Sequence, residues 1–406
     1  MSLNDTPMAQ RIHIGFFGLT NAGKSSLVNV ITNQQMSLVS DVKGTTTDPV
    51  RKSMELLPLG PVVIIDTPGY DDEGMLGDLR IGRMKEVLAT CDIAVFVTEN
   101  DTPVKEETEL LALIQARNIP CIVAGNKTDL VPSGGRSSAE DNEDAFQGFP
   151  VIPVSAISGQ GIEELKEAIA GALKQDEKEV RLVADLIGKG DTIVLVIPID
   201  SSAPKGRLIL PQQQAIRDIL DAGAVSIVTS VEGLAATLDG LKEPPALVIT
   251  DSQAFAKVSR IVPDRIPLTS FSILMARYKG FLRCAVKGAG AIDTLGDHAK
   301  ILIAEGCTHH RQCGDIGTVK LPAWLKKYTG KDFELTFTSG HGYPEDVSGF
   351  DLIIHCGGCM LNDNEVRNRM MAAENASVPF TNYGTAIAHM NGILARSIAP
   401  VSSDLS

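Results

Sequence analysis

The sequence predicts a protein of the α/β class, organised as three consecutive blocks in which strands alternate with helices. Short, wholly apolar runs such as Val62–Ile65 recur along the chain, and segments with apolar residues at helical spacing separate them. Hydrophobic residues make up 44% of the 406 residues but aromatic residues only 4%, a balance that fits layered α/β domains. A chain of this length has room for about two to four domains with separate cores.

The first block opens with a strand, a glycine-rich loop and a helix. Ile12–Phe17 has the composition of a short buried strand, and Ser25–Ile31 carries apolar residues at helical spacing. The loop between them reads Gly18-Leu19-Thr20-Asn21-Ala22-Gly23-Lys24-Ser25, a complete G-x-x-x-x-G-K-[ST] motif. In such a loop backbone N–H groups surround phosphate oxygens, Lys24 reaches the outer phosphates and the Ser25 hydroxyl ligates Mg²⁺. The motif therefore predicts a nucleotide site.

A second strand supplies the next part of this site. The apolar run Val62–Ile65 ends in Asp66-Thr67-Pro68-Gly69, a D-x-x-G motif. Asp66 provides a carboxylate for the Mg²⁺ shell, and the N–H of Gly69 can contact the γ-phosphate. The D-x-x-G motif after this strand therefore predicts nucleotide hydrolysis as well as nucleotide binding.

The base is predicted from two further strands. Cys121–Ala124 leads into Asn126-Lys127-Thr128-Asp129, the N-K-x-D pattern, and Val151–Val154 leads to Ser155-Ala156. Asp129 can accept hydrogen bonds from both the ring N–H and the exocyclic amine of guanine, which adenine does not offer together. The sequence therefore predicts a GTPase. The predicted GTP contacts are Gly18, Asn21, Ala22, Gly23, Lys24, Ser25, Ser26, Asn126, Lys127, Asp129, Ser155 and Ala156.

The loop sequence carries a family resemblance. Tyr70 stands where many small GTPases have a water-orienting Gln. The pattern Gly-x-x-Asn21-Ala-Gly-Lys-Ser-Ser-Leu-x-Asn29, with Gly44–Asp48 as switch segment, resembles the MnmE-type, potassium-activated GTPases. The resemblance implies that Asn21 is a K⁺ ligand and Thr46 the switch threonine on Mg²⁺, with Lys24, Thr46, Asp66 and Gly69 as catalytic residues. A loop-stabilising role for Asn21 is the alternative.

Composition limits the compartment and the partners. Residues 1–11 contain no apolar signal-peptide core, and no run approaches the roughly 20 apolar residues of a membrane span. Seven cysteines without an export signal favour a reducing, cytoplasmic location, where clustered thiols indicate metal. The lack of such an apolar run predicts no membrane association, and a net charge of −13 without a Lys/Arg-rich block argues against nucleic acid as the main partner.

Two more α/β blocks follow a polar run at 174–179. The predicted domains are a GTPase domain at 1–175, a second domain at 176–268 and a third at 269–406. The second shows no cluster of chemistry-bearing side chains, which predicts a structural or association domain. Its predicted elements are strands at 192–197, 225–229 and 246–250 and a helix at 212–220 that starts after Pro211.

The third block combines thiols and imidazoles. A predicted strand at 300–304 is followed by Cys307 and His309, and one at 350–354 by His355, Cys356 and Cys359. Because both groups follow strand ends, they can converge at one edge of the sheet. Three thiolates and an imidazole predict a metal site, either tetrahedral zinc or a 4Fe-4S cluster; a metal-free redox C-x-x-C pair is the third option.

The other cysteines and histidines carry weaker signals. Cys91, Cys121 and Cys284 lie in or beside apolar patterns, which predicts small core side chains. Cys313 and His310 could join the metal site or lie at the surface, and His341 is interpreted as a loop histidine.

Together the two motif sets resemble the HydF family of FeFe-hydrogenase maturation GTPases over the whole chain. The resemblance implies a GTPase domain, a dimerisation domain and a third domain with a 4Fe-4S cluster on Cys307, Cys356 and Cys359, and His309 or His355 as possible fourth ligand. It also implies a homodimeric scaffold that receives a diiron precursor from two radical-SAM maturases and delivers it to apo FeFe-hydrogenase. The alternatives are a GTP-dependent switch on RNA or ribosomes with a structural zinc domain, and a structural zinc protein with vestigial GTPase activity.

Overall fold

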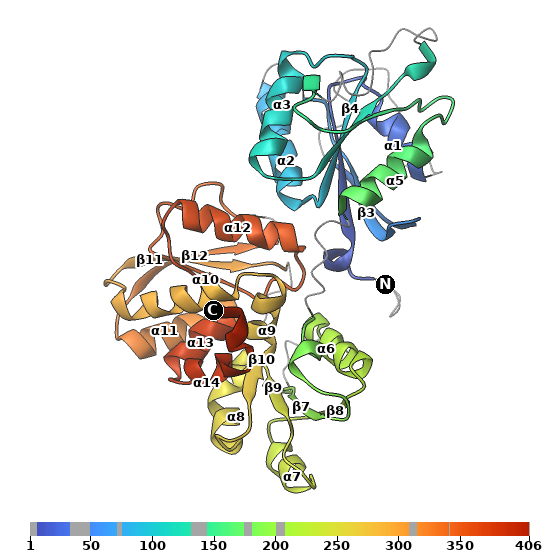
Figure 1. Cartoon of the computed structure of the whole chain (residues 1–406). Helices are drawn as coiled ribbons and strands as arrows, with labels where there is room; N and C mark the ends of the chain where they lie inside the picture. The colour runs from blue at the N-terminus through green and yellow to red at the C-terminus, as the bar shows by residue number, and fades with distance from the viewer. Residues whose placement is uncertain are drawn as a thin grey trace. The chain divides into compact units, whose positions relative to one another are not determined.

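The chain folds into two compact units, Met1–Lys178 and Glu179–Ser406 (Figure 1). The structure is a computed structural model. It describes residues 6–32, 49–70, 75–130, 144–173, 181–199, 208–307, 315–340 and 342–405. Both units consist of sheets with helices packed on them, so the predicted α/β class is confirmed.

The first unit is built on a six-stranded sheet in the order β2-β3-β1-β4-β5-β6. Only β2 is antiparallel to its neighbour, and the other strands run parallel. The strands are β1 (Ile12–Phe17), β2 (Val50–Leu56), β3 (Gly60–Asp66), β4 (Ile93–Thr98), β5 (Cys121–Gly125) and β6 (Val151–Pro153). The helices are α1 (Lys24–Thr32), α2 (Met75–Thr90), α3 (Lys105–Ala116) and α5 (Ile162–Leu173).

Each face of this sheet has its own hydrophobic core. Ile14 and Leu27 belong to the core beneath α1 and α5, and Phe96 and Leu110 belong to the core beneath α3. The central strands are apolar throughout because helices cover both of their faces. The carboxyl ends of β1, β3, β4 and β5 therefore meet at one edge, where loops can form a ligand site.

The second unit contains two four-stranded parallel sheets in the orders β10-β9-β7-β8 and β12-β11-β13-β14. The strands are β7 (Thr192–Val196), β8 (Val225–Thr229), β9 (Leu247–Thr250), β10 (Leu268–Ser270), β11 (Ala299–Glu305), β12 (Phe333–Ser339), β13 (Leu352–His355) and β14 (Phe380–Asn382). The helices are α6 (Leu210–Asp221), α7 (Leu234–Asp239), α8 (Phe255–Ile261), α9 (Phe271–Tyr278), α10 (Leu282–Ala289), α11 (Leu321–Thr329), α12 (Asp363–Asn375), α13 (Tyr383–Met390) and α14 (Leu394–Ile398).

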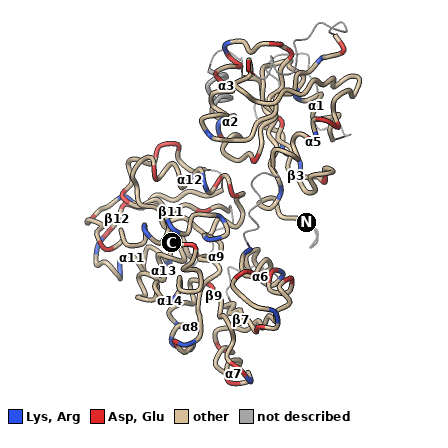
Figure 2. The backbone as a smooth tube through the Cα atoms, viewed as in Figure 1, with Lys and Arg blue, Asp and Glu red and all other residues tan. Residues whose placement is uncertain are grey.

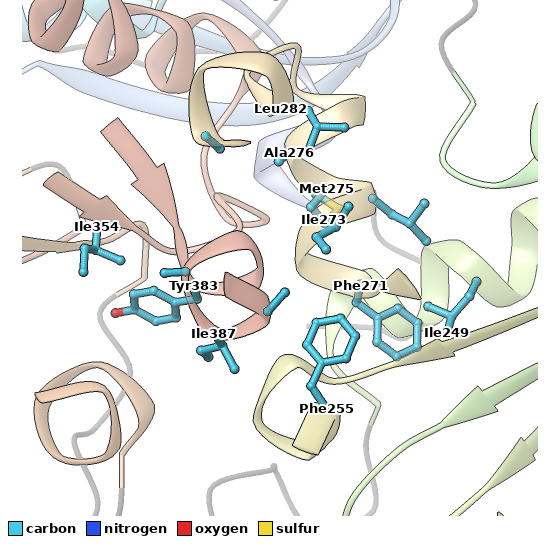
Figure 3. Packing of buried hydrophobic residues seen from close by; sticks show 14 of the residues in the cluster. Ile249, Phe255, Phe271, Ile273, Met275, Ala276, Leu282, Ile354, Tyr383 and Ile387 are labelled. Atoms are coloured by element: carbon cyan, nitrogen blue, oxygen red, sulfur yellow. The ribbon is translucent and has the colours of Figure 1, made fainter. Parts of the chain in front are cut away.

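One continuous core joins these two sheets. Phe255 and Phe271 follow strands of the first sheet. They belong to the same buried cluster as Ile354 of β13, in the second sheet, and Ile387 of α13 (Figure 3). Helices α9 and α13 contact each other and lie among these side chains (Figure 3). The predicted division of this unit at residue 268 stays a prediction.

The strand predicted at 350–354 begins and ends later than expected. β13 spans Leu352–His355, and Asp351 just before it is bonded to Lys300 of β11 through its N–H and through its carboxylate, each at 2.8 Å. His355 is consequently the last residue of the strand, with a fully buried side chain, and the loop begins at Cys356.

Candidate functional sites at two sheet edges

The G-x-x-x-x-G-K-[ST] loop joins β1 to α1, as the motif predicts. Asn21 and Gly23 have φ values of 64° and 91°. A Cβ on Gly23 would lie 2.2 Å from the Asn126 side-chain nitrogen, so only glycine fits at this position. The loop therefore packs directly against the N-K-x-D segment.

Lys24 lies buried inside this loop, with 6% of its surface exposed. Its ammonium donates hydrogen bonds to the carbonyl oxygens of Gly18 at 3.1 Å and Leu19 at 2.6 Å. The loop backbone thus holds a positive charge beside the N–H groups that face a phosphate in this motif.

The predicted Mg²⁺ ligands Ser25 and Asp66 lie side by side. The Ser25 hydroxyl donates to Asp66 Oδ2 at 2.6 Å. A Cβ on Gly69 would lie 2.1 Å from the Thr20 hydroxyl, so the D-x-x-G segment also packs closely on the phosphate loop. Thr46, the predicted third ligand, lies outside the described residues, as does the whole 44–48 segment.

The predicted guanine site is assembled at the ends of β5 and β6. Asn126 is 2% exposed; its amide donates to the Ala22 carbonyl at 3.0 Å and accepts from the Ala156 N–H at 3.1 Å. The Ser155 hydroxyl donates to the Asp129 carboxylate at 2.6 Å. Asn126 thus links the phosphate loop to the base-binding segments, and Ser155 orients the carboxylate that would select guanine.

Tyr70 follows the D-x-x-G motif but turns toward acidic residues of α3. Burial raises the pKa of its hydroxyl, and the nearby Glu109 and Glu106 raise it further. The phenol is therefore neutral at physiological pH.

The second site lies at the carboxyl edge of the β11–β13 pair. Ala304 and His355 are register partners, and the Cys356 N–H donates to the Ala304 carbonyl at 2.9 Å. A Cβ on Gly306 would lie 2.7 Å from Leu361 Cγ, so the segment after Cys359 covers the residue before Cys307. The two cysteine-bearing segments therefore meet, as the strand order predicts.

The Cys356 thiol is surrounded by backbone donors. Its Sγ accepts from the Gly306 N–H at 3.1 Å and from the Gly358 N–H at 3.3 Å. Burial raises the pKa of Cys356, and these two hydrogen bonds act in the opposite direction. Burial also raises the pKa of Cys359, to about 12. Backbone N–H groups directed at a cysteine sulfur are the arrangement that stabilises and tunes metal-bound thiolates.

His355 does not point freely toward the cysteines. Its Nδ1 lies 2.8 Å from the Cys356 carbonyl oxygen, and its Nε2 lies 3.2 Å from Arg369. Burial, followed by the Arg369 charge, lowers its pKa to about 3, so the ring is neutral and donates from Nδ1. Because both ring nitrogens have protein partners, the geometry favours a positioning role for His355 over the suggested role of fourth ligand.

The donor set at this edge fits an iron-sulfur cluster in its chemistry. Within the described ranges, no three His, Cys, Asp or Glu side chains are grouped as they are around a single metal ion. The thiolates of a 4Fe-4S cluster each bind a different iron, and the two N–H donors on Cys356 suit a cluster ligand. His309, His310, Cys313 and His341 lie outside the described residues.

The remaining cysteines occupy packed positions. Cys91 is fully buried and Cys121 is 4% exposed, which confirms the predicted core role of both. Cys284 is partly buried on α10, with its Sγ 3.9 Å from the Phe380 carbonyl oxygen.

Sequence patterns did not reveal several polar residues around Cys356. Arg369 and Lys279 are each 4% exposed and bond to the segments on either side of the C-x-x-C turn. The Tyr383 hydroxyl donates to Glu305 at 3.1 Å, at the end of β11. The i,i+4 spacing of Glu365 and Arg369 could have indicated an ion pair between them. Such spacing usually marks an exposed pair on a helix surface rather than a buried one.

No helix in the described part of the chain combines the length and apolarity needed to cross a membrane. Basic and acidic residues are both scattered along the two units (Figure 2).

Relatives of known sequence match the first unit. The tRNA modification GTPase MnmE of Moorella thermoacetica is 31% identical over 165 residues, covering 40% of this chain and 35% of the relative. GTPase Der of Wolinella succinogenes is 33% identical over 165 residues, covering 39% of this chain and 35% of the relative. The chain thus spans about a third of the length of these relatives.

The chain is also similar to solved structures of GTPases. The FeoB G-domain of Methanococcus jannaschii is 24% identical, with a TM-score of 0.32, and the match covers 40% of this chain and 98% of that one. Aquifex aeolicus Era bound to GDP and AlF₄⁻ is 19% identical, with a TM-score of 0.36, and the match covers 54% and 92%.

Family models match segments of both units. A 50S ribosome-binding GTPase model matches residues 13–127, so the first unit is a P-loop GTPase domain that binds GTP and Mg²⁺. The hydrogen maturase F dimerization domain matches residues 182–280, and the hydrogen maturase F tetramerization domain matches 283–400. These two models together cover more than half of the sequence and indicate that the second unit self-associates. With both HydF domains following a GTPase domain, the chain belongs to the hydrogen maturase F (HydF) family.

Proposed function

We propose that the protein is a GTP-hydrolysing scaffold that binds a 4Fe-4S cluster and delivers a diiron precursor to apo FeFe-hydrogenase. The observation that carries this proposal is the Cys356 thiol, which accepts two backbone N–H groups at a sheet edge within the HydF-type part of the chain. A GTPase domain on the same chain supports a role for nucleotide turnover in regulating an assembly step.

In the GTPase domain the proposed roles follow from the contacts. Lys24 neutralises the outer phosphates, and Ser25 and Asp66, already 2.6 Å apart, hold the Mg²⁺ shell together with Thr46. The Gly69 N–H contacts the γ-phosphate. Asp129, oriented by Ser155, accepts from guanine.

We expect Asp129→Asn to exchange guanine for xanthine preference. An amide donates to the oxo group that replaces the exocyclic amine, whereas a carboxylate only accepts there. The measurement is competition between GTP and XTP for binding and turnover, with a loss of preference of about 10²-fold or more for GTP. Thr128→Ala, which removes a hydrogen bond to the Val154 carbonyl but no base contact, is the control. An unchanged GTP preference in Asp129→Asn would contradict the base assignment.

We expect GTP turnover to depend on K⁺ rather than Na⁺. Asn21 lies in the loop with φ 64° and is exposed. A cation held there would offset the negative charge that develops on the phosphate oxygens in the transition state. Asn21→Ala should lose the K⁺ dependence and retain the basal rate. Equal wild-type rates in KCl and NaCl, measured at one ionic strength, would remove K⁺ from the proposal.

In the second unit, Cys307, Cys356 and Cys359 are the proposed cluster ligands, with His309 as a candidate for the fourth position. A 4Fe-4S cluster on three thiolates has one iron without a protein sulfur, which supplies an attachment point for the diiron precursor. The precursor is cargo: two radical-SAM maturases would build it and apo FeFe-hydrogenase would receive it. The dimerization and tetramerization domains support an oligomeric scaffold.

Anaerobic reconstitution with iron and sulfide tests this function. The proposal expects about four irons per chain, the stoichiometry of a 4Fe-4S cluster, and an EPR signal on reduction. Reconstituted protein should then support maturation of apo-hydrogenase in the presence of the two maturases. A protein that holds one tightly bound zinc, takes up no iron and still supports maturation would contradict it.

The alternative, a GTP-dependent RNA or ribosome switch with a zinc domain, is not favoured. The HydF domains cover residues 182–280 and 283–400, where that alternative needs a zinc domain. A net charge of −13 also opposes nucleic-acid binding.

A further inference from the structure

Two buried cations lie on either side of the C-x-x-C turn. Arg369 on α12 and Lys279 just after α9 are each only 4% exposed. Lysine and arginine are almost never buried to this extent unless their charges are paired. Both are paired here with carboxylates in the first turn of α12, the helix that begins at Asp363, four residues after Cys359.

Arg369 connects the start of the turn to the residue that follows strand β12. Its guanidinium donates to His355 Nε2 at 3.2 Å, to the Gly340 carbonyl at 2.5 Å and to the Glu365 carboxylate at 2.5 Å. His355 in turn donates from Nδ1 to the Cys356 carbonyl. The chain of donors from Arg369 through His355 therefore ends on the backbone of Cys356.

The aromatic ring of Tyr343 fixes the position of this guanidinium. Arg369 lies 5.1 Å from the Tyr343 ring centroid, and the Tyr343 hydroxyl donates to the Arg369 carbonyl at 3.3 Å. The His355 ring, in turn, stacks on Phe380 with 5.7 Å between ring centroids. Neither the guanidinium nor the imidazole can rotate without losing these contacts.

Lys279 holds the other end of the turn. Its ammonium donates to the Leu361 carbonyl at 2.8 Å and to the Asp363 carboxylate at 2.6 Å. Leu361 is the residue whose side chain covers Gly306, next to Cys307. Lys279 therefore fixes the segment that follows Cys359 and, through Leu361, the segment that carries Cys307.

We propose that Arg369 and Lys279 are positioning residues that hold the C-x-x-C turn from both ends in the conformation that receives the cluster. This inference rests on the proposed function, because it assigns the ligand turn to an iron-sulfur cluster. Neither residue touches the cluster: Arg369 acts through His355 on Cys356, and Lys279 acts through Leu361 on Cys359 and Cys307.

A purely structural role predicts a different set of results. If the two ion pairs only anchor α12, their removal lowers thermal stability and leaves cluster properties unchanged. If they position the turn, their removal changes how the thiols bind metal even in a folded protein, since outer contacts to metal ligands typically contribute about 10–100-fold in metal affinity.

Two variants separate these roles without leaving a buried charge unpaired. Lys279→Met keeps the aliphatic stem and leaves Asp363, whose side chain is 49% exposed, free to be solvated. Arg369→Gln combined with Glu365→Gln removes both buried charges together. Lys326→Met is the matched control, because Lys326 forms a 2.6 Å ion pair with Asp332 on the same unit and both side chains are about two-thirds exposed.

The measurements are iron retention against a chelator, the EPR signal and midpoint potential of the reduced cluster, and the melting temperature. We expect both test variants to melt cooperatively, to release iron at about 10–100-fold lower chelator concentration and to show an altered EPR signal and potential. Lys326→Met should match the wild type in all of these. Wild-type iron retention, EPR signal and potential in both test variants would overturn the inference, as would loss of cooperative melting in both.

A measurement on metal-free protein distinguishes failure of this inference from failure of the proposed function. The rate of alkylation of Cys356 and Cys359 by iodoacetamide, resolved by mass spectrometry, reports how firmly the turn is held. We expect both test variants to be alkylated severalfold faster than wild type and Lys326→Met. If wild-type protein takes up no iron, the proposed function fails, and these alkylation rates alone decide whether Arg369 and Lys279 position the turn.

Discussion

Cys356→Ser is expected to abolish cluster binding while the GTPase domain remains fully active. Cys356 Sγ accepts from the Gly306 and Gly358 N–H groups, so the backbone is arranged around a sulfur at this position. Serine offers a smaller, harder oxygen that suits iron-sulfur clusters poorly. We therefore expect iron content to fall to near zero after reconstitution, a larger loss than the roughly 10–100-fold effect of an outer contact. Maturation of apo-hydrogenase should fail with it.

The same replacement at Cys307 and Cys359 should have a comparable effect. Cys284→Ser is the matched control: its thiol is also partly buried in the second unit, but it lies on α10, with its Sγ 3.9 Å from the Phe380 carbonyl oxygen. Iron and sulfide analysis, EPR and GTP hydrolysis should be measured on all four variants. Full iron content in Cys356→Ser, or loss of iron in Cys284→Ser, would refute the ligand assignment.

Lys24→Ala and Ser25→Ala are expected to reduce GTP hydrolysis by at least about 10²–10³-fold, the loss that follows removal of one electrostatic contact in an active site. Lys24 supplies the only positive side chain that the motif directs at the outer phosphates. Ser25 is a proposed Mg²⁺ ligand and lies beside Asp66, the second proposed ligand, to which its hydroxyl donates at 2.6 Å. Rates should be measured with saturating GTP and Mg²⁺.

Cluster content gives the second readout for these two variants. The GTPase domain and the cysteine-bearing segments belong to separate compact units, so iron uptake should equal that of the wild type. Lys166→Ala is the control within the first unit, since Lys166 forms an ion pair with Glu163 on α5, away from the phosphate loop. Normal hydrolysis in Lys24→Ala, or iron loss in either variant, would contradict this separation of the two chemistries.

The nucleotide site was predictable because its parts are local in sequence. Each motif occupies a few consecutive residues at the end of an apolar strand, and parallel strands bring such ends to one edge. The Ser25–Asp66 and Ser155–Asp129 hydrogen bonds arise from that arrangement alone. The same reasoning anticipated that the segments of Cys307 and Cys356 would meet, since β11 and β13 are neighbours.

Positions that depend on contacts from distant segments were not predictable. The strand expected at 350–354 is observed at Leu352–His355, and the Asp351 side chain before it accepts a hydrogen bond from Lys300, 51 residues away. His355 is fully buried, with Phe380 stacked on its ring and Arg369 at its Nε2. No pattern in the residues around His355 indicates these partners.

The α/β class, the GTPase motifs and the cysteines of the second candidate site could be predicted from residue patterns, because strand patterns and motif spacing are local properties of the chain. The neutral, buried state of His355 and the contacts of Arg369 and Lys279 on either side of the turn became evident only in the folded structure. The physical reason is burial. A polar side chain is stable in the interior only where partners from other segments satisfy it, and those partners are brought together by folding.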